Sequence, residues 1–196
     1  MSHHTHDHEV PPGASVTTPL REEHRELLPS IEALANAADS IGDAPLAEQR
    51  ERVEAAHAFL SEELIPHATA EDQVLYGKVD QLIGSRGATG ATDTMRRDHA
   101  EVGRLTARLG ELRAKLDEGE LSSPEERELR RVLYGLHTLV GVHFAKEEEV
   151  YLPLLDRELA PEEARALFAE MERVKSVSSA SGQAPSGSPS QAQERH

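Results

Sequence analysis

The sequence predicts an all-α protein, built as an up-down antiparallel four-helix bundle with a short C-terminal fifth helix and disordered termini. Leu, Ala, Glu and Arg dominate the middle of the 196-residue chain, while aromatic residues make up only 3% of it. Such a composition favours helix by intrinsic propensity. Four long stretches also carry apolar residues three or four positions apart, with short polar segments between them. This pattern is typical of amphipathic helices that pack around a shared core.

The net charge and the missing cysteine exclude several classes of function. A formal charge of −15 argues against binding to nucleic acid or to an anionic membrane surface, because both rely on Lys and Arg. Without Cys there are no thiolate metal sites, iron–sulfur clusters or Cys nucleophiles, so a metal would need nitrogen and oxygen ligands. No apolar run suits a transmembrane helix or a signal peptide, and we therefore expect a cytoplasmic protein.

The N-terminal part of the chain divides into a tail and the start of the bundle. Residues 1–16 are polar and rich in His and Pro, so we expect them to be disordered and to lie outside the functional site. The bundle is expected to span residues 17–160. Its first helix begins at Thr18 and Pro19, since Thr is a favourable N-cap and Pro suits the first helical position, and it fades before Gly42.

The second and third helices follow from the same apolar spacing. The second is expected from about Pro45 to Ile83, with a bend at Pro66, because Pro removes one helical hydrogen bond. A loop with three Gly residues, GSRGATG, follows at 84–90, and the third helix covers roughly 92–117.

The fourth helix is predicted to open with a capping box at Ser123 and to continue to about Leu159, with a bend at Pro153. A short fifth helix is expected at about 161–175. The tail from 176–196 consists mainly of Ser, Gly, Gln and Pro and is expected to be disordered.

Histidines on the predicted core faces point to a metal site. Each of the four bundle helices carries one such residue near its middle, namely His24, His67, His99 and His143. Glu71 and Glu147 follow two of them by four positions, which places each Glu on the same helix face as its His. Burying a lone carboxylate is very costly, so this arrangement makes energetic sense if a cation lies between the helices.

The two halves of the chain repeat this pattern. The segment EHRE at 23–26 resembles DHAE at 98–101, and HATAEDQVLY at 67–76 resembles HFAKEEEVYL at 143–152. We therefore expect two similar helix pairs, related by a pseudo-two-fold axis, to bring six ligands to one level of the bundle. The predicted metal ligands are His24, His67, Glu71, His99, His143 and Glu147.

Other polar residues of the helices are not expected to bind the metal. His57 and His137 do not return to the faces of His67 and His143, which indicates solvated or outer positions. Glu26 and Glu101 flank the site but face solvent about as plausibly, so the sequence identifies no convincing proton donor. Packing roles are expected for Tyr76, Tyr134 and Tyr151, with an outer hydrogen bond to the site as an alternative for Tyr151.

Competing catalytic motifs are missing from the sequence. HExxH does not occur, which argues against a zinc protease of that class. Ferritin-like di-iron sites need Glu-x-x-His on two helices, and only Glu54 with His57 has that spacing. Neither a glycine-rich phosphate loop nor a GxSxG elbow is present.

The ordered set His, HxxxE, His, HxxxE resembles the hemerythrin-like family, also called the HHE cation-binding domain, over roughly residues 18–156. The resemblance implies two non-heme iron ions, bridged by carboxylates and by an oxo or hydroxo group. By position, the four predicted histidines would be terminal ligands, while Glu71 and Glu147 would bridge. Imidazole and carboxylate accept iron and manganese alike, so the sequence leaves the metal open.

One position departs from the oxygen-carrying hemerythrins. Those proteins have a second His one turn from the first on the third helix, where this chain has Met95 and Gly103. In the oxygen carriers, the carboxylate follows its histidine by five positions, which here would select Glu148. Glu147 is preferred because its spacing from His143 matches that of Glu71 from His67. Four histidines, two bridging carboxylates and one bridging oxygen would leave about two coordination positions open on two octahedral irons. The expected ligands are dioxygen, nitric oxide and hydrogen peroxide.

Three functions are compatible with such a site. The first is a binding protein for dioxygen or nitric oxide, and the second is an enzyme with catalase- or peroxidase-like activity. The third is an iron- or oxygen-responsive sensor or an iron store, which is weakened because the sequence shows no second recognisable domain for an output. The oligomeric state and the redox partner are not predicted.

Overall fold

The computed structural model describes residues 15–84 and 90–182, and within these ranges it contains helices and no strand. The predicted all-α class is confirmed. The disorder predicted for residues 1–14 and 183–196, and most of the loop predicted at 84–90, lie outside the described residues.

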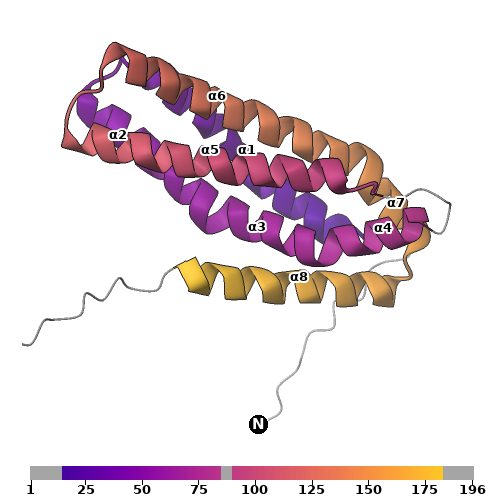
Figure 1. Cartoon of the computed structure of the whole chain (residues 1–196). Coiled ribbons are helices and arrows are strands. Elements are labelled where there is room, and N and C mark those ends of the chain that lie inside the picture. The colour runs from indigo at the N-terminus through magenta and orange to yellow at the C-terminus, as the bar shows by residue number, and fades with distance from the viewer. Residues whose placement is uncertain (1–14, 85–89, 183–196) are drawn as a thin grey trace, which may run out of the picture.

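Four helical rods run alternately up and down and form the predicted bundle (Figure 1). The first and third rods are the single helices α1 (Thr18–Ser40) and α5 (Asp93–Glu118). The second consists of α2 (Leu46–Phe59), η1 (Leu60–Leu64), α3 (Ile65–Ala70), η2 (Glu71–Leu75) and α4 (Tyr76–Gly84). The fourth consists of α6 (Ser123–Lys146), η3 (Glu147–Tyr151) and α7 (Leu152–Glu158). Because α1 and α5 each pack against both α2 and α6, the rods close around one core.

The bends predicted at Pro66 and Pro153 take the form of π-helical turns. The residue before each proline bonds five positions back, from the Ile65 N–H to the Leu60 carbonyl and from Leu152 to Glu147. The wider turn lets both rods continue through a residue that has no N–H of its own. A third π turn, η2, begins at Glu71 without a proline.

Two helices begin at the predicted residues, Thr18 and Ser123, but their predicted N-caps are wrong by one residue. The N-cap of α1 is Thr17, whose backbone N–H and hydroxyl both donate to Asp156 Oδ1, at 3.0 and 2.9 Å. The N-cap of α6 is Ser122, not Ser123, and its N–H donates to Glu125 at 3.0 Å. In both helices Pro occupies the second helical position, which suits it as well as the first because neither position needs an intrahelical N–H.

The predicted limits of the disordered segments also need correction. The fifth helix, α8 (Pro161–Gly182), is longer than predicted, and residues 176–182 are helical. The hydroxyls of Ser176 and Ser179 bond to carbonyls one turn earlier, which lets Ser fit inside a helix. At the N-terminus, Ser15 is held against α7 by a 2.6 Å hydrogen bond to Asp156.

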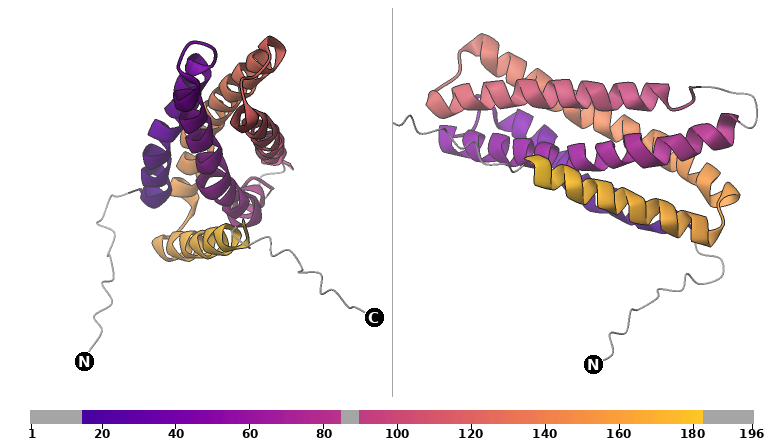
Figure 2. Two further views of the ribbon diagram at one scale, coloured as in Figure 1. Left: turned by 90° about the vertical axis from the view of Figure 1, so that its left-hand side faces the viewer. Right: turned by 60° about the horizontal axis from the view of Figure 1, so that its bottom comes forward.

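The core consists of two apolar clusters with a polar level between them. On α1, His24 separates Leu20 of one cluster from Leu27 of the other, and on α5 His99 separates Met95 from Val102. The cluster that contains Leu20 and Met95, which we call the second apolar cluster, also includes residues of α8. This helix lies along α3 and η2, outside the bundle (Figures 1 and 2). The buried polar level is thus closed above and below by hydrocarbon.

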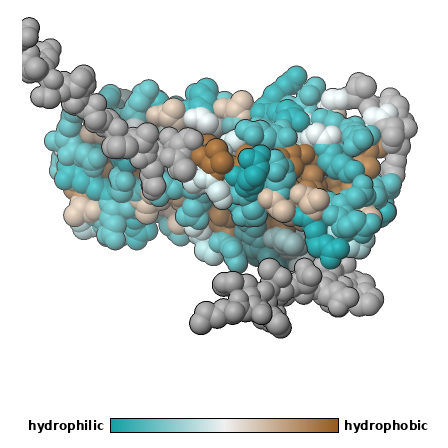
Figure 3. Space-filling view, turned by 90° about the horizontal axis from the view of Figure 1, so that it is seen from below, coloured by the Kyte–Doolittle hydropathy of each residue, from teal (hydrophilic) through white to brown (hydrophobic). Residues whose placement is uncertain are grey.

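The outer surface is largely hydrophilic on the face that α8 covers (Figure 3). Large exposed apolar side chains come from α1, α6, η3 and α8, namely Leu28, Tyr134, Val142, Val150 and Val177. None of the helices in residues 15–84 and 90–182 is long and apolar enough to span a membrane. The cytoplasmic location stays a prediction.

Candidate metal centre

The structure brings all six predicted site residues to the polar level between the two apolar clusters. His24 comes from α1, His67 from α3, His99 from α5 and His143 from α6, while Glu71 and Glu147 are the first residues of η2 and η3. Both carboxylates are 0% exposed. Two ionisable acids at the centre of a small domain would be severely destabilising unless positive charge accompanies them.

Each carboxylate directs one oxygen toward the pair His24 and His67 and the other oxygen toward the pair His99 and His143. Oε1 of Glu71 lies 3.1 Å from Nε2 of His67, and its Oε2 lies 3.3 Å from Nε2 of His99. Oε2 of Glu147 lies 3.5 Å from Nε2 of His24, and its Oε1 lies 3.6 Å from Nε2 of His143. This is the arrangement that two bridging carboxylates need.

Two overlapping groups of side chains are therefore able to hold a metal ion. One comprises His24, His67, Glu71 and Glu147, and the other comprises Glu71, His99 and His143. Within each group the ligand atoms lie within 4.8 Å of one another. Because Glu71 belongs to both, the donor set fits a pair of ions that share a carboxylate.

Unpartnered polar atoms support this fit. Within the described residues, Nε2 of His24 and of His67, both oxygens of Glu71 and Oε2 of Glu147 are buried and have no hydrogen-bond partner. Nε2 of His67 and Oε1 of Glu71 are close, but their orientation is not that of a hydrogen bond. Buried polar atoms are nearly always satisfied, and a cluster of exceptions calls for an explanation. Cations between the carboxylates would satisfy all of these atoms at once.

Tyr76 belongs to the site, although the sequence indicated only a packing role. Its hydroxyl donates to Oε1 of Glu147 at 2.6 Å and lies 3.1 Å from Nε2 of His143. Burial and the charges of Glu71 and Glu147 raise the pKa of Tyr76, so the phenol stays protonated. In an α-helix, a residue five positions after Glu71 would leave its face, whereas the π turn η2 returns Tyr76 to it. No signal in the sequence marks that π turn.

The hydroxyls of the other two tyrosines bond to groups other than the predicted metal ligands. The hydroxyl of Tyr151 donates to the Ala91 carbonyl at 2.9 Å, so the alternative of an outer hydrogen bond to the site is wrong. Tyr134 is exposed and donates to Asp39.

Every imidazole of the site is held at its outer nitrogen, Nδ1, by a carboxylate from a neighbouring rod. The four distances from Nδ1 to the acceptor oxygen are 2.8 Å for His67–Glu23, 3.0 Å for His99–Asp72, 3.3 Å for His143–Asp98 and 2.9 Å for His24–Glu148. Because a carboxylate only accepts, Nδ1 carries a proton, and in the neutral form of each imidazole the lone pair of Nε2 faces the centre. Such outer carboxylates fix the tautomer and orientation of metal-binding histidines.

These four carboxylates, which we call the outer ring, connect the rods in a closed cycle. α1 holds α3, η2 holds α5, α5 holds α6, and η3 holds α1. The sequence analysis missed this role, although each ring residue directly precedes His24 or His99 or directly follows Glu71 or Glu147. Glu148, considered there as an alternative ligand, bonds to the outer nitrogen of His24, whereas Glu147 points inward.

The two buried carboxylates differ in proton affinity. Burial raises the pKa of both, and the negative charge of Glu71 raises that of Glu147 further, well above its usual range. For Glu71, the positive charge of His67, with the nearby imidazoles of His24 and His99, outweighs burial and holds its pKa well below the usual value. The first carboxylate to ionise therefore suppresses ionisation of the second.

The histidines compensate for the charge of Glu71. Burial by itself lowers the pKa of His67, but Glu71 and Glu23 outweigh it and raise the value to about 10. Burial also lowers the pKa of His99, but the carboxylates of Asp72 and Glu71 outweigh it and raise the value to about 9. Burial, with repulsion from His99, lowers that of His143 to about 4. In the absence of metal, protons on His67 and His99 supply the positive charge.

The remaining residues considered from the sequence are outside the site. His57 contacts Arg113 at 3.4 Å, and His137 contacts Glu32 at 3.4 Å. Glu101 pairs with Arg104 on the surface, and Glu26 is exposed. The expectation that His57 and His137 do not bind the metal agrees with these positions.

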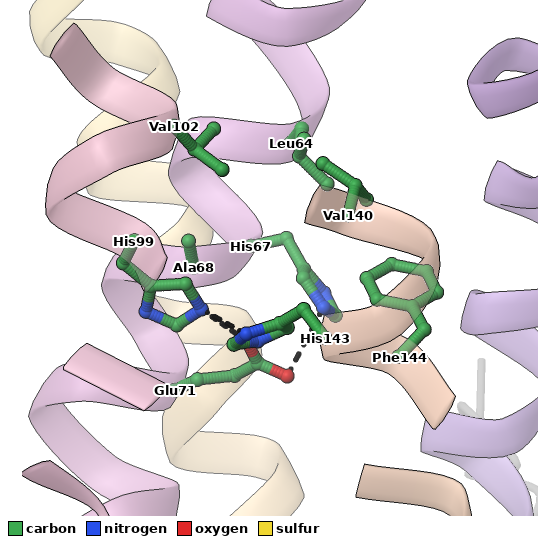
Figure 4. Close-up of a pocket in the computed structure, with 9 residues that line it drawn as sticks. All are labelled: Leu64, His67, Ala68, Glu71, His99, Val102, Val140, His143 and Phe144. Atoms are coloured by element: carbon green, nitrogen blue, oxygen red, sulfur yellow. Dashed lines mark hydrogen bonds and ion pairs between the residues drawn. The ribbon is translucent and has the colours of Figure 1, made fainter. Parts of the chain in front are cut away.

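A small cavity lies against the imidazoles, under an apolar roof (Figure 4). Its volume is about 10 Å³, the least that one water molecule needs. Leu64, Val102 and Val140 form the roof above His67, His99 and His143, and Phe144 closes one side. Phe144 also stacks on His24, with 4.3 Å between ring centres, and lines an outer depression of about 430 Å³ between α1 and α6.

Comparison with protein families finds one that matches this chain. The model described as the hemerythrin HHE cation-binding domain matches residues 15–155, well over half of the sequence. Comparison with curated proteins and with solved structures finds no significant match. The matched range contains all six predicted ligands and the whole outer ring, and it ends before α8.

The charge balance predicts that metal binding displaces protons. His67 and His99 carry protons at pH 7 because their pKa values are about 10 and about 9, whereas a metal needs neutral imidazole. Apparent metal affinity should therefore rise from pH 6.5 to 8.5, and calorimetry in buffers of different ionisation enthalpy should detect released protons. His57→Asn, which changes an imidazole outside the site, should keep this dependence. Affinity that is flat or falls over the same range would contradict the charge assignment.

Proposed function

The chain belongs to the hemerythrin HHE cation-binding family, and on that premise we propose that it is a non-heme di-iron protein that binds a small diatomic ligand. The observation that carries the proposal is the pair of fully buried carboxylates, each with one oxygen toward either pair of histidines. His24 and His67 would hold one iron, His99 and His143 would hold the other, and Glu71 and Glu147 would bridge. An iron pair of this kind supplies an open coordination position for dioxygen or nitric oxide.

The surrounding side chains favour a neutral and very small ligand. The cavity beside the imidazoles measures about 10 Å³. Its roof consists of Leu64, Val102 and Val140, which offer no hydrogen bond to a polar substrate. Small apolar cavities select ligands by size and shape, and the roof also keeps bulk water from the imidazoles. A diatomic molecule fits these limits, while an organic substrate does not.

Peroxide turnover is a second candidate, favoured by the phenol of Tyr76. Its hydroxyl lies between Glu147 and His143, at 2.6 and 3.1 Å, and would be a proton donor other than imidazole, which the sequence alone did not identify. A hydroxyl within hydrogen-bond reach of the site has the position that a general acid needs. Two peroxide molecules would then yield two water molecules and one dioxygen.

Replacing either bridging carboxylate should remove iron from the protein. In Glu71→Gln and Glu147→Gln the amide keeps the size of the side chain but loses the negative charge, and we expect fewer than two irons per chain after reconstitution with ferrous iron. Glu149→Gln is the matched control, because Glu149 is exposed and adjacent to the site in sequence. Colorimetric iron analysis measures the result. Two irons per chain in both site variants would show that these carboxylates do not bridge.

Filling the cavity should weaken binding of nitric oxide. Val140 is 2% exposed and lines the roof, so Val140→Leu places an added methylene in the space that a diatomic ligand would occupy. We expect about a tenfold loss of nitric oxide affinity, the usual size of a one-methylene effect in an apolar pocket. Val142→Leu is the control, since Val142 is 53% exposed. Equal affinities for both variants, measured by spectroscopic titration, would place the ligand elsewhere.

Tyr76→Phe separates the two candidate functions. If the iron-loaded protein is a peroxide enzyme, oxygen release from added peroxide should be clear in the wild type and fall about 100-fold in the variant, as expected for loss of a general acid. If it is a binding protein, neither form should release oxygen at a significant rate, and nitric oxide binding should persist in both. An oxygen electrode gives the measurement.

A further inference from the structure

Each outer-ring carboxylate also contacts a cation on its outer side. Arg21 pairs with Glu148, and Lys146 pairs with Asp98. Arg96 lies 3.7 Å from Oδ1 of Asp72 and donates to its backbone carbonyl. The fourth cation is Lys175, whose Nζ lies 2.5 Å from Oε1 of Glu23. Every imidazole of the site is therefore followed outward by a carboxylate and then by a cation.

Three of these cations belong to the bundle, but the fourth does not. Arg21, Arg96 and Lys146 lie on α1, α5 and α6, inside the range that matches the family. Lys175 lies on α8, after the end of that range. Lys175 contacts Glu23 on the side away from His67.

We propose that Lys175 is a positioning residue for His67, acting through Glu23, and that α8 is thereby a working part of the metal centre. The inference rests on the proposed function, because it assumes that His67 binds a metal. It goes beyond it by assigning a role to a helix that the family domain does not include.

The contacts of Glu23 show how Lys175 would act. One oxygen, Oε1, accepts both from Nδ1 of His67 at 2.8 Å and from Nζ of Lys175 at 2.5 Å. The two donors approach the same atom from the inside and the outside of the bundle, so they fix its position between them. Without Lys175, the partly exposed Glu23 side chain is free to turn toward water, and His67 loses the acceptor that sets its tautomer and ring orientation.

Hydrophobic packing of α8 against the bundle fixes the position of this contact. Met171 and Val174 of α8 are 2% and 7% exposed and belong to the second apolar cluster. α8 lies on α3 and η2, the elements that carry His67 and Glu71. Lys175 directly follows buried Val174, and its side chain is only 22% exposed. The helix thus holds the ammonium group over Glu23 by hydrophobic packing.

The test compares iron release from full-length variants loaded with ferrous iron. Lys175→Met removes the charge but keeps most of the side chain, while Lys175→Arg retains the charge. Arg173→Met is the matched control, because Arg173 lies on the same helix, is 63% exposed and pairs with Glu170 of that helix. Glu23→Gln and the Lys175→Met/Glu23→Gln double variant complete a mutant cycle. Transfer of iron to a coloured chelator gives the rates, and thermal unfolding of the metal-free forms reports on folding.

The two irons are expected to respond differently to the loss of Lys175. One of the two irons should leave about three- to tenfold faster in Lys175→Met, which is at or below the lower end of the roughly 10–100-fold effect of direct outer partners on metal affinity, because Lys175 acts one contact further out. Glu23→Gln should have a larger effect, and the double variant should match Glu23→Gln alone. Lys175→Arg and Arg173→Met should release iron at the wild-type rate.

Different outcomes would overturn different claims. Release from Lys175→Met at the rate of Arg173→Met, while the wild type holds two irons, would refute the inference and leave the proposed function standing. Independent effects in the double variant would refute action through Glu23. A wild-type protein that binds no iron would refute the proposed function itself. If Lys175→Met lowers thermal stability more than Arg173→Met, Lys175→Gln replaces it, and the same mutant cycle decides.

Discussion

The structure depends on the burial of two carboxylates, Glu71 and Glu147, at the centre of a four-helix bundle. Neither is exposed, and apolar clusters close the level on both sides. Isolated buried charges of this kind would outweigh the small net stability of a domain. Two features of the fold follow from this constraint: the histidines that surround the acids and the outer ring that holds those histidines.

The π-helical turns shape the centre at both acids. Glu71 and Glu147 are the first residues of η2 and η3, which extend the pseudo-two-fold relation from the sequence to the backbone. The relation breaks where the two halves need different groups. Tyr76 reaches Glu147 and His143, whereas Tyr151 bonds to a backbone carbonyl elsewhere. One half of the site therefore carries a phenol, and the other leaves the Nε2 atoms of His24 and His67 unpartnered.

How far the sequence predicts the centre depends on whether a residue's position follows from helical periodicity. His67 with Glu71 and His143 with Glu147 were identified because the i,i+4 spacing and the apolar faces are properties of single helices. The outer ring was missed because Glu23 reaches His67 only once the register between α1 and α3 is known. Tyr76 was missed because an α-helix was assumed where the chain forms a π turn. The extension of α8 to Gly182 was missed because tertiary packing and Ser hydroxyl bonds outweigh weak helix propensity.

Diffraction from crystals of the iron-loaded protein, recorded at the iron absorption edge, tests the central claim most directly. Our account predicts two anomalous peaks, one beside His24 and His67 and the other beside His99 and His143, with Glu71 and Glu147 in contact with both. A single peak, or iron bound away from these residues while either carboxylate stays free of metal, would contradict it.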